Sequence, residues 1–233
     1  MRRAFHPVIL LLLCAESAFA QGRGFVGGSV IASVQGSEAP TGSVSLPRSG
    51  VGGFSIGGNA EIGIDVTPRF GVLAEVTAPV PFEAQQLNSR LSGNYQQTAA
   101  TTTNHTDIVF SGLVGWNTRI TERTDMSLVF GPSLVREYST SQTSISFLPV
   151  GGIPAPPLPD SVGRVMDVSR WTLGLTTGVS VAFKVRSKLE CVPLVRAHWI
   201  DRETNLSFPT GSAAVLGLAP VVFRFGIGLR VRF

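Results

Sequence analysis

The sequence predicts an all-β fold, an eight-stranded antiparallel up-and-down transmembrane β-barrel, and three observations lead to this prediction. The C-terminal stretch alternates between apolar and polar positions. Charged residues are only 15% of the chain and the mean hydropathy is +0.27, yet no apolar run reaches the roughly 18–20 residues of a transmembrane helix. Finally, the connections between the predicted strands alternate between long and short, which is typical of such barrels.

The C-terminal stretch, residues 221–233, is the clearest strand. Every odd-numbered position is apolar and bulky, and from Arg224 onward every even-numbered position is Arg or Gly. A period of two predicts a strand with one apolar face and one polar face. A length of about 12 residues suits a tilted strand that crosses a bilayer. The chain ends on Phe233, an aromatic residue of the apolar face, at the depth of an interfacial girdle.

The first 20 residues have the features of a cleavable export signal. Arg2 and Arg3 precede a short apolar core at residues 8–14, and Ala18-Phe19-Ala20 matches a cleavage site. We therefore expect residues 1–20 to be a signal peptide and residues 21–233 to form one barrel domain. The core is too short for a membrane anchor, and the residue before Cys14 is larger than in lipoprotein signals. Cys191 would then be the last remaining cysteine, which excludes an intrachain disulfide.

Three strands are predicted in the first third of the mature chain. Residues 24–35 and 54–66 alternate between apolar and small or polar side chains, and residues 70–78 repeat the pattern after a tight turn at residues 67–69. Residues 36–51, which contain proline, glycine and serine, are predicted to be a loop. In the second of these strands Glu61 and Asp65 share one face while the other face is wholly apolar, which indicates a polar interior and an apolar exterior.

Four more strands are predicted before the last one, at residues 107–119, 125–139, 171–184 and 189–201. Pro132 predicts a bulge, because proline cannot donate to a strand ladder. Short links are predicted at residues 120–124 and 185–188. Long loops without any periodicity are predicted at residues 79–106, 140–167 and 202–218, so that the long connections are extracellular and the short turns periplasmic. Aromatic residues fall near the strand ends, as interfacial girdles require: Phe54, Phe70, Trp116, Tyr138, Trp171, Phe183, Trp199 and Phe233.

Residues 21–233 resemble the small eight-stranded outer-membrane proteins, the OmpA-like, OmpX-like and opacity-type barrels, in strand pattern, loop alternation and aromatic C-terminal strand. The resemblance implies a bacterial outer-membrane location, contact with lipid and lipopolysaccharide, and a monomer. In such families the last strand is read by the barrel-assembly machinery, and the matching residues here are Phe223, Phe225, Val231 and Phe233. No OmpA-type peptidoglycan-binding domain follows in the sequence, which argues against a role in gripping the cell wall.

The strand phases predict a network of charged side chains in the lumen. The residues placed there are Glu61, Asp65, Glu75, Glu137, Glu190, Arg119, Lys184, Arg196, Arg224, Arg230 and Arg232. An eight-stranded barrel is just wide enough for side chains to fill it, and buried charges must be paired. Two interpretations stay open: a structural salt-bridge network, or a narrow pore gated by an Arg–Glu switch among Glu61, Glu75, Arg196 and Arg224.

The residues give little support to catalysis or to a bound cofactor. Outer-membrane lipid A deacylases and acyltransferases use an outward-facing His and Ser, whereas the phase of His198 points it inward and no Ser lies two residues on. His105 falls in a predicted loop. No cluster of His, Cys and Asp has metal-ligand spacing. The pattern G-x-G-x-x-G at residues 22–27 neither follows a strand nor opens a helix, so it does not predict a dinucleotide site. We therefore predict no catalytic residues, no cofactor and no metal.

The remaining function is recognition at the cell surface. The polar stretches at residues 85–106 and 140–167 are where such a scaffold would bind an extracellular ligand. The formal net charge is +4, but the basic residues are spread over strands and turns, so neither a compact basic patch nor nucleic-acid binding is predicted. The prediction is a non-enzymatic outer-membrane barrel with a role in envelope integrity and in surface binding through its loops. A narrow channel for small solutes or ions and a lipid A-modifying enzyme are the alternatives.

Overall fold

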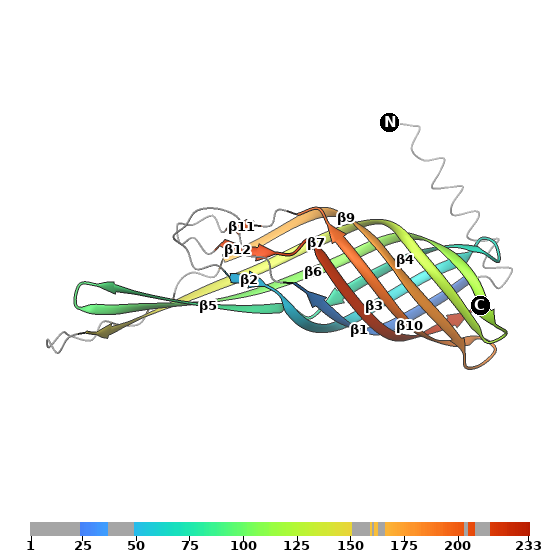
Figure 1. The fold of residues 1–233 in the computed structure, drawn as a ribbon, viewed down its shortest axis with the longest axis horizontal. Coiled ribbons are helices and arrows are strands. Elements are labelled where there is room, and N and C mark those ends of the chain that lie inside the picture. Colours follow the sequence, from blue (N-terminus) through green and yellow to red (C-terminus); the bar gives the residue numbers. More distant parts are fainter. Residues whose placement is uncertain are drawn as a thin grey trace, which may run out of the picture.

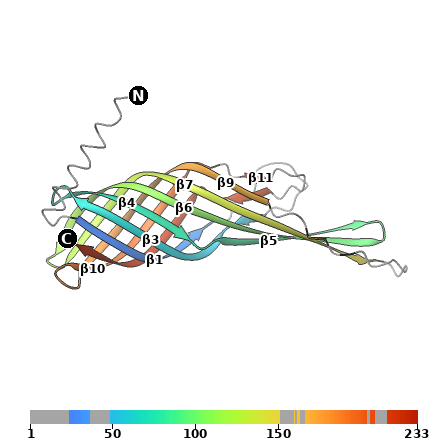
Figure 2. The same ribbon diagram turned by 180° about the vertical axis from the view of Figure 1, so that it is seen from behind.

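A computed structural model describes residues 24–36, 49–150, 159, 161–162, 166–202, 205–207 and 215–233. Eight strands form a closed antiparallel ring in which each strand pairs with its neighbours in chain order (Figures 1 and 2). The ring consists of β1 (Gly24–Gln35), β3 (Gly53–Asp65), β4 (Phe70–Pro79), β6 (Tyr95–Thr121), β7 (Thr124–Pro149), β9 (Met166–Lys184), β10 (Leu189–Ile200) and β13 (Val221–Arg232). Because β1 also pairs with β13, the ring has no open edge. The predicted fold class is confirmed.

The two faces of the strands follow the predicted phase. On β3, Ile62 is 49% exposed while the adjacent Glu61 is 6% exposed. The same alternation continues around the ring, so the outer face carries a belt of exposed apolar side chains that includes Val30, Phe130, Leu173 and Ile227. Among the described residues, no helix has the length and apolar character needed to cross a membrane. The predicted signal peptide and Cys14 lie outside the described residues.

Three short turns lie at one end of the ring, together with the C-terminus (Figure 1). In the first, the backbone N–H groups of Arg69 and Phe70 donate to the hydroxyl of Thr67 at 3.2 and 3.0 Å, which fixes the turn between β3 and β4. The other two turns join β6 to β7 and β9 to β10. This is the predicted periplasmic end.

Two of the predicted long loops contain long strands instead. Residues 82–92 form β5 (Phe82–Ser92), β6 begins at Tyr95 rather than at residue 107, and β7 continues to Pro149 rather than ending at residue 139. Together β5, β6 and β7 form a narrow three-stranded ribbon that projects beyond the barrel (Figures 1 and 2). The prediction failed because the ribbon is built from Thr, Ser and Gln, whose hydropathy does not alternate, although β-branched Thr favours strands.

Short strands also occur within other stretches predicted as loops. Strand β8 (Ser161–Val162) pairs with β7, while β2 (Ser49–Val51), β11 (Asn205–Ser207) and β12 (Val215–Leu218) form a separate small sheet. In this sheet β2 and β12 are parallel. These described parts of the predicted loops are therefore strands, although their glycine and proline content predicted none.

The prediction of a bulge at Pro132 is wrong. On one side, Ser133 pairs with Ser111 and Phe130 with Val114, which is one continuous register. On the other side, Pro132 itself pairs with Leu175 in an unbroken register with β9. The missing N–H of proline removes a donor from the ladder without shifting it. The register shift between β6 and β7 lies instead at the turn, between Arg119 and Thr121.

Candidate functional site in the barrel interior

The barrel interior is built of alternating polar and apolar layers. Inward positions recur every second residue along a strand, and on β6 they are Asp107, Val109, Ser111, Leu113 and, beyond Gly115, Asn117. The adjacent strand β7 supplies Glu137, Val135, Ser133, Gly131, Val129 and Ser127 in matching order. Two apolar layers therefore separate three polar ones, and each polar layer can be described by its own contacts.

The polar layer nearest the periplasm holds two arginines of the last strand. Arg230 lies 2.8 Å from Glu61, and Arg232 lies 2.5 Å from Asp65 and 2.6 Å from Glu190. Glu61 and Arg230 are on β3 and β13, which are separated by β1. They meet because Gly27 of β1 is paired with both residues and has no side chain; a Cβ there would lie 2.8 Å from the Glu61 carboxylate.

An apolar layer follows, made of Phe25, Leu73, Leu113 and Val129. The ring of Phe25 lies against Gly63, where an added Cβ would come within 2.4 Å of its Cζ. The guanidinium carbon of Arg230 lies 4.2 Å from the centroid of the same ring, within the range of a cation–π interaction. The cavity beside this layer has a volume of only about 20 Å³, so the layer closes the lumen.

The central polar layer contains two fully buried arginines that face each other on adjacent strands. Arg196 pairs with Glu75 at 3.0 Å and donates to the carbonyl of Val179 at 3.1 Å. Arg224 lies opposite Arg196 in the register and donates to the carbonyl of Asp107 at 3.0 Å. The Nε and Nη1 of Arg224 have no hydrogen-bond partner among the described residues. Such groups need water as a partner.

Hydroxyl groups and His198 complete the central layer. The hydroxyl of Ser111 forms hydrogen bonds with the hydroxyls of Ser133 at 2.9 Å and Thr176 at 3.1 Å. The hydroxyl of Thr176 also forms a hydrogen bond with Nδ1 of His198 at 2.8 Å. His198 is buried, as its predicted inward phase requires. Above it, Val109, Val135, Ile200 and Val222 form the second apolar layer.

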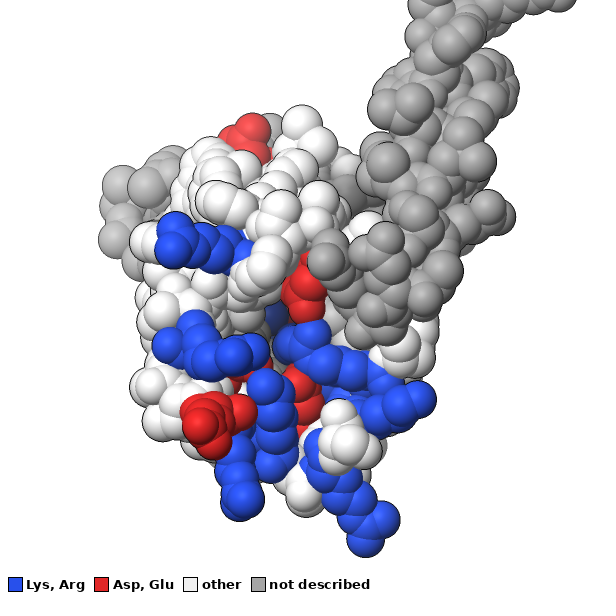
Figure 3. All heavy atoms as spheres, turned by 90° about the vertical axis from the view of Figure 1, so that its right-hand side faces the viewer, with Lys and Arg blue, Asp and Glu red and all other residues white. Residues whose placement is uncertain are grey.

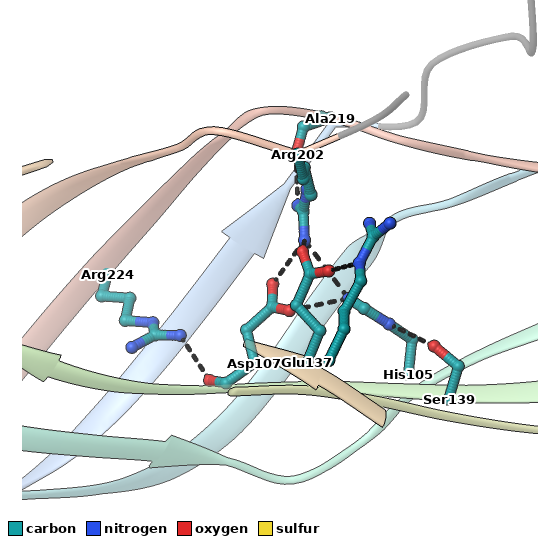
Figure 4. Close-up of polar contacts among 8 residues, drawn as sticks. His105, Asp107, Glu137, Ser139, Arg202, Ala219 and Arg224 are labelled. Atoms are coloured by element: carbon teal, nitrogen blue, oxygen red, sulfur yellow. Dashed lines mark hydrogen bonds and ion pairs between the residues drawn. The ribbon is translucent and has the colours of Figure 1, made fainter. Parts of the chain in front are cut away.

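The extracellular polar layer is centred on Arg202 (Figure 4). Its Nη1 lies 2.9 Å from Asp107 of β6 and 3.2 Å from Glu137 of β7, and its Nε donates to the carbonyl of Ala219 at 2.9 Å. Glu137 also pairs with Arg170 of β9. Arg202, which follows β10, thereby contacts β6, β7 and the segment before β13. Its buried side chain fills the extracellular end of the lumen.

His105 and Ser139 lie in the same layer. Nε2 of His105 is 2.8 Å from Asp107, and Nδ1 is 2.7 Å from the hydroxyl of Ser139. Serine, histidine and aspartate in this order are the residue types of a nucleophilic triad. Ser139, however, is only 1% exposed, so its hydroxyl is not accessible to a substrate in this structure. The described residues contain no group of three His, Cys, Asp or Glu placed to hold a metal ion.

The structure brings most of the predicted lumen residues together but not all. Nine of them lie inside: Glu61, Asp65, Glu75, Glu137, Glu190, Arg196, Arg224, Arg230 and Arg232. Seven of these pair with one another, whereas Glu137 pairs with Arg170 and Arg202, and Arg224 donates to the carbonyl of Asp107. Arg119 is a correction: its side chain is 72% exposed at the turn, where it pairs with Asp125 at 3.5 Å, and Lys184 pairs with the same carboxylate at the barrel mouth. The four gate candidates do not form one group, because Glu61 pairs with Arg230 and Arg224 with a backbone carbonyl.

Five residues of the extracellular layer were missed: His105, Asp107, Ser139, Arg170 and Arg202. His105 is on β6 and not in a loop. Polar side chains at positions 101, 103, 105 and 107 share one face of β6 and are buried, so an alternation of polar residues could have extended the strand. Arg202 follows the end of β10 and belongs to no strand, and no sequence pattern marks it.

The periplasmic mouth opens into a cavity of about 760 Å³ whose lining includes Arg69, Arg119, Lys184 and Arg232. Figure 3 shows this end of the barrel, where Lys and Arg side chains gather around a hollow and Asp and Glu are fewer. The prediction that the basic residues form no compact patch is therefore wrong. Turns that are far apart in the sequence meet at one end of the ring, and the basic residues they carry meet with them.

The four residues of the predicted assembly signal lie on the outer face. Phe223, Phe225, Val231 and Phe233 are all exposed there. The backbone of Phe233 also forms two hydrogen bonds with Gly24, at 3.0 and 3.2 Å, so the last residue closes the ring against the first strand. Cys191, on β10, is partly exposed and is a free thiol.

Comparison with known proteins finds similarity in fold only. No model of a known protein family and no curated protein sequence matches the chain. Among solved structures, Ail, the attachment invasion locus protein of Yersinia pestis, is 13% identical with a TM-score of 0.43, over 91% of this chain and 99% of Ail. OprG, an outer membrane protein of Pseudomonas aeruginosa, is 13% identical with a TM-score of 0.48, over 91% of this chain and 97% of OprG. A major outer membrane protein of Thermus thermophilus is 14% identical with a TM-score of 0.44, over 89% of this chain and 99% of that protein.

Proposed function

We propose that this protein is a non-enzymatic barrel of the bacterial outer membrane whose interior is a structural plug and whose extracellular ribbon binds partners at the cell surface. A closed ring with an apolar exterior is the form in which strands cross a bilayer, because every backbone group is paired within the ring. The observation that carries the proposal of a plug is the succession of buried layers around Arg202, around the Glu75–Arg196 pair and around Phe25.

Each of these layers fills the lumen with large side chains. Arg196, Arg224 and Glu75 are fully buried in the central layer, and an eight-stranded ring leaves room for little else. A plug of this kind blocks the lumen and transports nothing. An envelope protein with such an interior contributes to the integrity of the membrane and acts through what lies outside the lumen.

Conductance tests the plug. The protein refolded from detergent into a planar bilayer is expected to give no stepwise current in 1 M KCl. The variant Arg202→Ala, which removes the centre of the extracellular layer, is expected to stay silent as well, since two further layers remain. Regular single-channel steps from the wild-type protein would contradict the proposal.

The second candidate is a narrow channel, and the unpartnered donors of the central layer favour it. Nε and Nη1 of Arg224, Nη2 of Arg196 and Nε2 of His198 have no partner among the described residues, which is consistent with a hydrated centre. The Glu75–Arg196 pair would then be the gate. If the wild-type protein conducts, Glu75→Gln should change the size or the open fraction of the steps, whereas Arg119→Gln at the exposed mouth should leave the open fraction unchanged.

Surface binding is assigned to the ribbon of β5, β6 and β7. Strand β5 stands at one end of the strand order, and a sheet edge with extended backbone is suited to pairing with an extended segment of a partner. The test compares bacteria that display the wild-type protein or the variant Thr98→Pro, whose proline interrupts the central strand of the ribbon. Retention on cultured epithelial cells is expected to fall with Thr98→Pro. Equal retention of bacteria that display the wild-type protein and Thr98→Pro would contradict binding through the ribbon.

Export and assembly complete the proposed function. Residues 1–20 are removed on export, the C-terminal strand is recognised by the barrel-assembly machinery, and the monomer lies among lipid and lipopolysaccharide. The exposure of Phe223, Phe225, Val231 and Phe233 on one face supports this assignment. Phe233→Ala is expected to reduce the amount of heat-modifiable protein in outer-membrane fractions, while Phe54→Ala on another strand should not.

A further inference from the structure

The periplasmic rim of the barrel carries more exposed basic side chains than exposed acidic ones. Arg69, Arg123, Arg186 and Lys188 lie in or beside the three short turns and are all exposed. None of the four forms an ion pair with any residue in the described part of the chain. Most acidic side chains at this end form ion pairs with other basic residues: Asp65 pairs with Arg232, and Asp125 pairs with Arg119 and Lys184. Glu122 is the exposed acid left among the turns.

Two of the four basic residues lie directly beside the edge of the apolar belt. Arg69 precedes Phe70 and Arg186 follows Val185, and both apolar neighbours are exposed on the outer face. A residue advances a strand by only about 3.3 Å, so these cationic groups lie within a few ångströms of the end of the belt. Long basic side chains at such positions extend along the apolar surface and place their charge at the level of lipid headgroups.

The positive charge of the rim continues into the cavity at the periplasmic mouth of the barrel. The cavity of about 760 Å³ behind the rim is lined by Arg69, Arg119, Lys184 and Arg232, against the carboxylates Asp65 and Asp125. Walls of low dielectric strengthen the field of charges of one sign in a concave site. Basic side chains therefore outnumber acidic ones at this end of the barrel, as Figure 3 shows.

We propose that this basic rim, formed by Arg69, Arg123, Arg186 and Lys188, binds the phosphate groups of anionic phospholipids in the periplasmic leaflet. The partner is a headgroup that carries a phosphate and no compensating cation, such as phosphatidylglycerol. A zwitterionic headgroup brings its own positive charge and gains less from the rim. Binding orders a shell of anionic lipid around the turns and holds the barrel at a fixed depth in the bilayer.

The test uses Trp116 as a reporter. Trp116 pairs with Phe70, next to Arg69, whereas the other two tryptophans, Trp171 and Trp199, lie toward the opposite end. The full chain carrying Trp171→Phe and Trp199→Phe is refolded into vesicles of phosphatidylcholine that contain brominated phosphatidylglycerol or, in parallel, brominated phosphatidylcholine. Bromine quenches the fluorescence of a nearby indole, so the ratio of quenching measures the preference for anionic lipid.

The expected preference for phosphatidylglycerol is about fivefold or more, and it should fall to about one in the variant Arg69→Gln/Arg123→Gln/Arg186→Gln/Lys188→Gln. Two controls bracket this result. Arg136→Gln, an exposed basic residue near the other end, should change nothing, and Glu122→Gln should raise the preference. If the fourfold variant does not show heat-modifiable migration, the variant Arg186→Gln/Lys188→Gln is measured instead, and a partial loss is expected.

Competition by NaCl and by inorganic phosphate distinguishes binding of a lipid headgroup from binding of a soluble phosphate ion. Raising NaCl to about 1 M should abolish the preference by screening. Inorganic phosphate should act only as strongly as NaCl of equal ionic strength. An equal preference in the wild-type protein and the fourfold variant would overturn the proposal. A loss caused by millimolar inorganic phosphate alone would overturn it too, since the mouth would then bind a soluble anion rather than lipid.

Discussion

At the scale of single residues, Arg202 is the side chain on which the extracellular layer depends. It is the shared partner of Asp107 and Glu137 and reaches the backbone of Ala219. Removal of one partner from a buried ion pair leaves charges without compensation in a medium of low dielectric. Such a loss is far larger than that of a pair at the surface.

Arg202→Ala is therefore expected to lower the free energy of unfolding by about 3–5 kcal/mol. The measurement is urea-induced unfolding of the protein refolded in lipid vesicles. The control is Arg119→Ala, whose partner is at the exposed mouth, with an expected loss of about 0–1 kcal/mol. Equal losses in the two variants would show that Arg202 does not hold the layer together.

Gly27 has a role that is visible only in the pairing of three strands. It lies between Glu61 and Arg230 and leaves the space in which they meet. Gly27→Val should separate the pair and lower the free energy of unfolding by about 3 kcal/mol.

Gly28→Val is the matched control for Gly27→Val, since a side chain at position 28 points outward and meets nothing closer than 3.7 Å. Urea unfolding of both variants tests the difference. If Gly28→Val is as damaging as Gly27→Val, the backbone and not the space over Gly27 is responsible.

The residues that could be predicted are those on strands with visible alternation. Phase alone places Glu61, Glu75, Arg196, Arg224 and Arg230 in the interior, because one inward residue on a strand determines the others. The phase of a strand does not predict which charged side chains pair, because Arg230 pairs with Glu61 across the intervening strand β1. Nor can it find Arg202, which lies outside every strand and is held in place by tertiary contacts alone.

At the scale of elements, the eight strands of the ring were predictable and the ribbon was not. A strand in the bilayer must alternate, since one face meets lipid and the other the lumen. Outside the bilayer that requirement ends. Strands β6 and β7 continue for ten residues or more beyond their predicted ends on cross-strand pairs such as Thr101 with Thr143 and Thr103 with Ser141, 3.0 and 3.1 Å apart.

Thr98→Pro should disrupt the ribbon and spare the ring. Position 98 pairs with Ser89 on one side and with Ser146 on the other, so a proline removes a ladder donor from a central strand. Limited proteolysis of intact cells should cleave the variant faster at residues 82–104, with unchanged heat-modifiable migration. Thr98→Val, which keeps the N–H and the β-branch, should behave like the wild-type protein, and faster cleavage of it would argue against the pairing.

At the scale of the whole molecule, the apolar belt determines where the barrel lies. Ile227, in the middle of β13, is 61% exposed on this belt. A charge on the lipid-facing surface of a barrel is most costly at the bilayer midplane. Ile227→Arg is expected to lower the free energy of unfolding from vesicles by about 2–4 kcal/mol, and Val66→Arg, at the periplasmic turn, by about 0–1 kcal/mol.

Urea titration of refolding into vesicles gives both values, and the same loss for the two variants would mean that Ile227 does not face the hydrocarbon.

The hydrogen bonds between Gly24 and Phe233 have a consequence for how the molecule forms. The two partners in this seam, Gly24 and Phe233, are separated by 209 positions in the sequence, so a partly made polypeptide that still lacks β13 cannot join them. Closure of the ring must therefore wait for β13, and contacts so distant along the chain form slowly. Until that moment both seam strands display bare hydrogen-bonding edges, and a chaperone or an insertion catalyst that shields them would decide the yield.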